Sequence, residues 1–186
     1  TPIPDHPRDQ LRAAIGAVFR SSRSDRARRY AARESMPEVP PTAVVVQAMV
    51  FGNLGSDSGT GVAFSRDPST GLGPPCGDFL PDAQGEDVVG GTRPTLPLAA
   101  MRDHVPQAHE ALMSAITRLE AHYRDLCDIE FTVQEGRLYL LQARPGKRAA
   151  IAAVRLAVAL VDDPAIRLSR AEALGRVSRE HLQQLQ

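Results

Sequence analysis

The chain has 186 residues, of which 42% are hydrophobic and 24% charged, with 22 basic and 22 acidic side chains. That length and apolar content suffice for one globular domain, or for a domain with an appendage. The zero net charge gives no sign of a nucleic-acid or anionic-membrane partner, and no apolar run approaches the ~20 residues of a membrane-spanning helix. We expect Cys76 and Cys127 to be free thiols of a cytoplasmic protein, because no metal-ligand spacing surrounds them.

The N-terminal part predicts two helices and a stiff connector. Pro7 suits the first turn of a helix, and Leu11, Ile15, Val18 and Phe19 follow at helical spacing. A second, short helix is expected over residues 24–33. The prolines of residues 36–41 cannot continue it and predict a connector. The chain starts at Thr1 rather than at an initiator methionine, so we expect it to be cut from something longer.

The middle of the chain predicts strands separated by glycine-rich turns. Residues 42–51 are β-branched and apolar on both faces, which is typical of a central strand covered on both sides. Residues 52–61 are expected to form a turn, followed by a strand at 62–65 and another around Phe79. Residues 84–91 are predicted to be a loop.

The C-terminal half predicts a long helix, a β-hairpin and further helices. Apolar residues repeat at three and four from Val105 or Pro106 to Leu126. A hairpin over 128–144 follows, then a helix over 147–161, and Ser169 is expected to cap another helix that runs toward Leu182. Strand hairpins between helices indicate an α+β fold with a mainly antiparallel sheet flanked by helices, and with helical extensions at both ends.

The hairpin is the most informative segment because its residues segregate by chemistry. Alternate side chains of a strand share a face, so Asp128 and Glu130 point one way while Ile129 and Phe131 point the other. The length of the turn determines which alternate residues of the second strand lie on each face, which we call the parity of that strand. A three-residue turn at 134–136 is expected, because it places Gln142 and Arg144 on the face of the acids. Tyr139 and Leu141 would then join the core face, which avoids an unpaired buried amide.

Two carboxylates, an amide oxygen and a guanidinium on one patch suit a magnesium–polyphosphate site. Mg²⁺ prefers hard oxygen ligands and bridges phosphate oxygens, and arginine binds phosphate through its planar fork. The alternative is an exposed strand face on which Arg144 forms an ordinary salt bridge with one of the acids. Residue types alone leave both interpretations open.

Four stretches of sequence in the same order resemble the ATP-grasp nucleotide-binding domain of the pyruvate phosphate dikinases. They are Val44–Gly55, Asp57–Gly71, Ala83–Val89 and His122–Arg148. The resemblance spans roughly residues 8–186. Phosphoenolpyruvate synthases and rifampicin phosphotransferases share the acid and Gln-x-Arg pattern, but the words GEDVV and PGKR fit the dikinases best. The resemblance implies three regions: a helical lead-in and connector at 1–41, an ATP-grasp subdomain at 42–146, and a helical linker toward a phosphohistidine domain at 147–186.

The resemblance also implies roles for individual residues. Glu130, Gln142 and Asp128 would hold Mg²⁺, and Arg144 and Asp128 would act in phosphoryl transfer. In a strand that forms the hinge wall of the ATP cleft, the amide of Gln47 would read the adenine edge and Met49 would pack on the ring. The other reading of that pair is a core methionine and a glutamine satisfied by backbone groups.

The family's reaction converts ATP, pyruvate and phosphate to AMP, phosphoenolpyruvate and diphosphate through a phosphohistidine carrier. The resemblance places an N-terminal ATP-grasp lobe, the carrier domain and a pyruvate barrel outside this sequence, as its partners. The expected function is therefore the ATP-binding part of a phosphotransferase, inactive as an isolated fragment. The alternatives are a truncated, non-catalytic nucleotide-binding or interaction module, and part of a phosphoenolpyruvate synthase-like enzyme.

Overall fold

The computed structural model describes residues 3–33, 36, 42–91 and 93–185, which divide into two compact units, Thr1–Met49 and Val50–Gln186. In the first unit, α1 (Pro7–Ser21) and α2 (Asp25–Arg33) confirm the two predicted helices. The amide of Arg8 donates to Nδ1 of His6, which caps α1. Most of the predicted connector lies outside the described residues. No helix among those described is long and apolar enough to cross a membrane.

The strand predicted over residues 42–51 is wrong for this chain. Residues 42–51 have no strand structure, and Val45, Val46 and Met49 are 80%, 67% and 67% exposed. A strand requires a neighbour for its backbone hydrogen bonds. No described strand pairs with this segment, so its β-branched composition is not sufficient to make it one.

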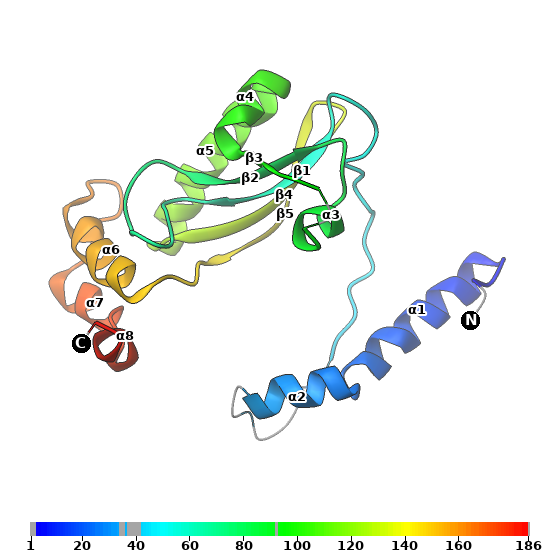
Figure 1. Cartoon of the computed structure of the whole chain (residues 1–186), viewed down its shortest axis with the longest axis horizontal. Coiled ribbons are helices and arrows are strands. Elements are labelled where there is room, and N and C mark those ends of the chain that lie inside the picture. The colour runs from blue at the N-terminus through cyan, green and yellow to red at the C-terminus, as the bar shows by residue number, and fades with distance from the viewer. Residues whose placement is uncertain (1–2, 34–35, 37–41, 92, 186) are drawn as a thin grey trace. The chain divides into compact units, whose positions relative to one another are not determined.

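The second unit contains a five-stranded sheet in the order β3-β2-β1-β4-β5, and all neighbouring strands are antiparallel (Figure 1). The strands are β1 (Gly59–Phe64), β2 (Cys76–Pro81), β3 (Leu96–Pro97), β4 (Cys127–Gln134) and β5 (Arg137–Pro145). The helices of this unit are α3 (Gly85–Val89), the 3₁₀ turn η1 (Leu98–Ala100), α4 (Met101–His104), α5 (Pro106–Tyr123), α6 (Ala150–Asp162), α7 (Arg170–Gly175) and α8 (Arg179–Gln183). The predicted α+β class with a mainly antiparallel sheet is confirmed.

Two of the predicted elements differ in detail. The expected loop at 84–91 contains α3, whose start is stabilised by the amide of Gln84 donating to Oδ2 of Asp87 at 3.0 Å. Ser169 caps a helix as predicted, but α7 ends at Gly175. Ser178 then caps the separate α8, because its hydroxyl accepts from the amide of His181.

The main core lies between α5 and one face of the sheet. Its members include Phe79 and Phe131, whose rings stack with centroids 6.4 Å apart. A Cβ at Gly59 would lie 2.6 Å from the Phe79 ring, and one at Gly61 would lie 2.6 Å from the Phe131 ring. Gly59 and Gly61 of β1 therefore leave space for the rings of Phe79 and Phe131, which belong to the neighbouring strands β2 and β4. These glycines do not form the turn predicted over residues 52–61, which ends before them.

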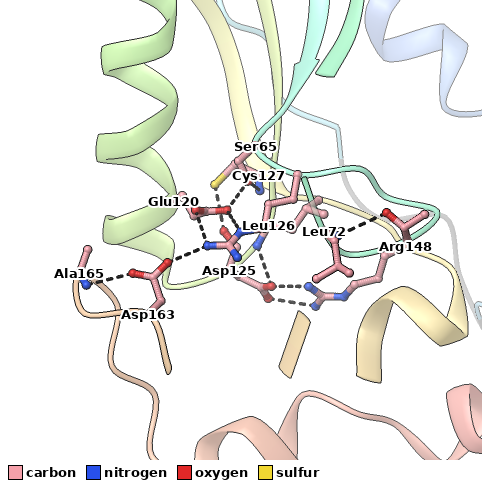
Figure 2. A network of polar contacts seen from close by, with 11 residues as sticks. Ser65, Leu72, Glu120, Asp125, Leu126, Cys127, Arg148, Asp163 and Ala165 are labelled. Atoms are coloured by element: carbon pink, nitrogen blue, oxygen red, sulfur yellow. Dashed lines mark hydrogen bonds and ion pairs between the residues drawn. The ribbon is translucent and has the colours of Figure 1, made fainter. Parts of the chain in front are cut away.

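A second core cluster joins the C-terminal helices to Leu126, just before β4. Figure 2 shows a polar network that includes Glu120, Asp125 and Asp163. Arg66, just after β1, donates to Glu120 of α5 at 2.9 Å and to Asp163 after α6 at 2.8 Å. The hydrogen bond to Glu120 raises the pKa of Arg66 against the opposing effect of burial.

Asp125 is the other centre of this network. It precedes β4, is 5% exposed and forms ion pairs with Arg148 and Arg176, which flank α6 and α7. Burial alone would raise the pKa of Asp125, but the hydrogen bonds and charge of Arg148 and the charge of Arg176 outweigh it and lower the pKa. One carboxylate therefore connects the start of β4 to two helical segments.

We predict that Asp125→Asn lowers the free energy of unfolding by about 3 kcal/mol, because it leaves two poorly exposed arginines without their carboxylate. The measurement is urea unfolding followed by circular dichroism. Glu172→Gln, which weakens the more exposed pair with Arg124, is the matched control and should cost much less. Equal losses in the two variants would contradict a special role for Asp125.

The same variant has a predicted pH dependence. Because the folded-state pKa of Asp125 is lowered, its contribution is complete above the ordinary value of 3.8 and disappears as the pH falls through the lowered value. The stability difference between the parent chain and Asp125→Asn should therefore shrink below pH ~4.

Candidate functional site

The hairpin that carries the candidate site turns through two residues, not three. Gln134 pairs with Arg137, and Glu135 and Gly136 between them have φ of 50° and 75°. Positive φ at both central residues is typical of the tight hairpin turns whose twist matches that of the strands. The predicted three-residue loop is therefore wrong.

A β-bulge restores the predicted parity at the other end of the hairpin. Glu130 lies opposite Gln142 while Phe131 lies opposite Leu140, so Leu141 has no partner on β4. The extra residue shifts the alternation of β5 by one. Beyond the bulge, Asp128 pairs with Arg144, and all four predicted polar residues share one face of the sheet, as the sequence indicated.

The apolar half of that prediction is only partly confirmed. Ile129 and Phe131 are fully buried on the α5 side. Between the turn and the bulge the parity is the opposite of that predicted, so Tyr139 pairs with Thr132 on the face of the acids. Leu141 is 49% exposed. The residues of β5 that pack against the core are Leu138 and Ala143.

We call the side of the sheet opposite α5 the open face, and its central residues are Val62, Phe64, Asp128, Glu130, Gln142 and Arg144. At one end of this face Thr60, Leu80 and Thr132 are buried. The short helix α3 contacts β1 and β2, which carry two of these residues. Glu130 is half-buried, while Gln142 and Arg144 are exposed. The polar side chains of the candidate site are thus at least partly accessible to solvent.

Asp128 and Arg144 form the closest contact of the site. Nε and Nη2 of Arg144 donate to Oδ2 of Asp128 at 2.9 and 2.8 Å. The Asp128 side chain is 12% exposed and that of Arg144 is 56% exposed. The hydrogen bonds to Asp128 and its charge raise the pKa of Arg144, and the charge of Glu130 adds to this. This is the salt bridge that the alternative reading expected, and it leaves part of the guanidinium fork facing solvent.

Glu130 and Gln142 lie directly opposite each other, so their side chains project side by side from neighbouring strands. Their carboxylate and amide oxygens are hard donors suited to Mg²⁺. Among the described residues, no group of three or more His, Cys, Asp or Glu side chains could hold a metal ion alone. Two protein oxygens, from Glu130 and Gln142, would leave most of the coordination sphere of a bound magnesium ion to waters or to ligand oxygens.

Gln47 and Met49, the predicted adenine contacts, fall in the first compact unit rather than in the unit of the hairpin. Both are exposed and lie outside any strand. The chain connects to the hairpin just beyond them, where the amide of Phe51 donates to Oε1 of Gln134 at 2.9 Å.

Asp78 is an acidic residue of the open face that sequence reasoning did not single out. It pairs with Val62, which pairs with Glu130, so the two carboxylates lie in one row across the sheet. Two strand spacings, about 10 Å, separate their backbones, and Val62 lies between them. Asp78 and Glu130 are aligned only by the pairing of β1 with β2 and β4. No local signal in the sequence encodes that pairing.

Two comparisons with known proteins found relatives of this chain. Residues 6–98 and 106–159 match the family model described as pyruvate phosphate dikinase, AMP/ATP-binding domain. The chain is 49% identical over 184 residues to pyruvate, phosphate dikinase 1, chloroplastic, of Oryza sativa subsp. japonica, covering 99% of this chain and 19% of that protein. It is 47% identical over 183 residues to pyruvate, phosphate dikinase of Clostridium symbiosum, covering 98% of this chain and 21% of that protein.

The chain thus spans about a fifth of the length of the relatives that it matches. The match covers both compact units, including the hairpin with its four polar residues. By sequence, the chain belongs to the pyruvate phosphate dikinase family, as part of its AMP/ATP-binding domain.

Proposed function

We propose that this chain forms the magnesium- and ATP-binding surface of a pyruvate phosphate dikinase-like phosphotransferase. The observation that carries the proposal is the convergence of Asp128, Glu130, Gln142 and Arg144 on the open face, produced by the bulge at Leu141. In this proposal the whole enzyme converts ATP, pyruvate and phosphate to AMP, phosphoenolpyruvate and diphosphate. The chain alone is incomplete for that reaction and is inactive.

Each of the four residues has a distinct proposed role. Glu130 and Gln142 supply metal ligands, because their oxygens lie side by side on the open face. Arg144 binds a phosphate through the part of its fork that Asp128 does not occupy. Asp128 fixes the orientation of Arg144 and offers its second oxygen toward the metal or its waters. The metal, when bound, would neutralise charge that develops on the transferring phosphoryl group.

The remaining parts of the proposal concern the partners and the location. The partners are ATP and the other domains of a complete dikinase: an N-terminal ATP-grasp lobe, a phosphohistidine domain and a pyruvate barrel. Gln47 and Met49 would contact adenine in the complete enzyme. The proposed location is the cytoplasm, on the basis of the two free cysteines. No nucleic acid or membrane partner is proposed.

A second candidate function is a nucleotide-binding or interaction module without phosphoryl transfer. The salt bridge between Asp128 and Arg144 favours it, since a purely structural surface pair would have the same geometry. A phosphoenolpyruvate synthase-like enzyme is the other alternative, because the acid and Gln-x-Arg pattern does not separate the two enzymes. Glu130→Ala in a complete dikinase distinguishes phosphoryl transfer from the non-catalytic module.

The first prediction is that the isolated chain binds Mg·ATP weakly or undetectably. The candidate ligands lie on an open sheet face, so bound phosphates would stay solvated and their attraction to Arg144 would be screened. Isothermal titration calorimetry with magnesium in excess measures this, with adenosine as the control ligand. A sub-micromolar dissociation constant would show that the chain already forms a complete cleft.

The second prediction concerns Glu130→Ala within a complete dikinase. The rate of ATP-dependent histidine phosphorylation should fall about a hundredfold or more, since loss of one electrostatic contact to a transferring phosphoryl group costs ~3 kcal/mol of barrier. Phosphoryl transfer between phosphoenolpyruvate and the carrier histidine should hardly change. Rapid-quench measurement of each half-reaction checks this.

Glu110→Ala is the matched control, because Glu110 is an exposed carboxylate on α5, away from the open face. Both half-reactions should keep their rates in that variant. If Glu130→Ala slows both half-reactions equally, Glu130 supports the whole structure and does not act at the ATP site. If it slows neither, the non-catalytic module becomes the better description of the open face.

A further inference from the structure

Three basic residues follow one another closely in sequence around the end of β5, and only one of them has no acidic partner among the described residues. Arg144 pairs with Asp128, and Arg148 pairs with Asp125. Lys147 is exposed and forms no hydrogen bond or ion pair with any residue that the structure describes. It is also the single lysine among the 22 basic residues of the chain. The uncompensated positive charge of this segment is therefore an ammonium group.

The backbone on both sides of Lys147 is held in place. The amide of Gly146 donates to the carbonyl of Leu126 at 2.7 Å, and the amide of Ala149 donates to the carbonyl of Pro68 at 2.9 Å. The side chain of Arg148 is fixed by Asp125. These contacts anchor the segment against the start of β4 and the loop after β1, so the Lys147 backbone keeps its place relative to the hairpin.

The three-residue spacing between Arg144 and Lys147 limits the distance from Lys147 to the open face. Three residues of extended chain span at most ~11 Å, so the Cα atoms of Arg144 and Lys147 are no farther apart than that. The four-carbon stem of lysine extends its ammonium group by a further ~6 Å and rotates freely. A polyphosphate bound at Arg144 is itself several ångströms long. The ammonium group is therefore within reach of the phosphates of such a ligand.

We propose that Lys147 binds the polyphosphate chain of a magnesium nucleotide held on the open face. This inference rests on the proposed function, which places the metal at Glu130 and Gln142. Asp128 already occupies two donors of Arg144, so the phosphates need a second cation. A lysine ammonium suits this role because it binds phosphate as a compact point charge that can follow the phosphate group.

Because Lys147 is the only lysine, one labelling step isolates it. Reductive dimethylation with ¹³C-formaldehyde labels Lys147 and the terminal amine of the chain, and it preserves both positive charges. The labelled chain of residues 1–186, also enriched in ¹⁵N, is titrated with magnesium tripolyphosphate into the millimolar range. The ¹³C methyl resonances report on Lys147, and the amide resonances of β4 and β5 report on the open face. Adenosine is the control ligand.

The expected result is a saturable shift of the Lys147 methyl resonance with the same dissociation constant as the hairpin amides, while the terminal amine shifts little. If the hairpin amides shift and the Lys147 resonance does not, this inference is wrong and the proposed function stands. If neither group of resonances shifts, the inference is wrong, while the proposed function, which already expects weak or undetectable Mg·ATP binding by the isolated chain, is tested separately by Glu130→Ala.

Unlabelled variants provide an independent measurement through the hairpin amides. Lys147→Gln should weaken tripolyphosphate binding roughly two- to fivefold, the range expected for one solvent-screened charge contact. Lys147→Arg should keep most of the affinity. Arg155→Gln, which removes one exposed charge from α6, is the matched control and should have no effect. Equal affinities of Lys147→Gln and Arg155→Gln would overturn the inference.

Discussion

The β-bulge at Leu141 determines which side chains of the hairpin share a face, and the candidate site depends on it. Burial of Ile129 and Phe131 against α5 fixes the orientation of β4. The two-residue turn then gives β5 a parity that would place Gln142 and Arg144 on the core side. One unpaired residue reverses that parity before Gln142. The amide and guanidinium therefore reach the open face without burial of an unpaired polar group, which would cost about 1–3 kcal/mol.

The core beneath this hairpin is organised around two aromatic rings and the glycines that admit them. Phe79 and Phe131 stack across β1, and Gly59 and Gly61 leave the space for their rings. Side chains at these glycines would push β1 away from the rings. Packing on the α5 side thus constrains the strand that separates the acids of β4 from Asp78 of β2. The geometry of the open face follows from close packing on the opposite face.

Charge pairing connects this sheet to the C-terminal helices. Asp125 joins the start of β4 to Arg148 and Arg176, and Arg66 joins the end of β1 to Glu120 and Asp163. Ion pairs with so little exposure contribute more to orientation than to net stability, but loss of one partner is costly. The same contacts fix the segment that carries Lys147 beside the hairpin. The helices are therefore part of the support for the open face.

The sequence by itself determined the identity and spacing of the acids, the amide and the arginine. It also determined the existence of most helices, because periodicity and capping residues such as Ser169 act locally. The resemblance of its motifs to the dikinases identified the family that the comparisons confirm. Only the tertiary structure decided that a bulge, rather than the turn, sets the parity of β5, and that Tyr139 lies with the acids. It also decided that residues 42–51 are not a strand in this chain. The physical reason is the same in each case: strand pairing and register depend on hydrogen bonds and packing between segments distant in sequence, which composition and alternation do not specify.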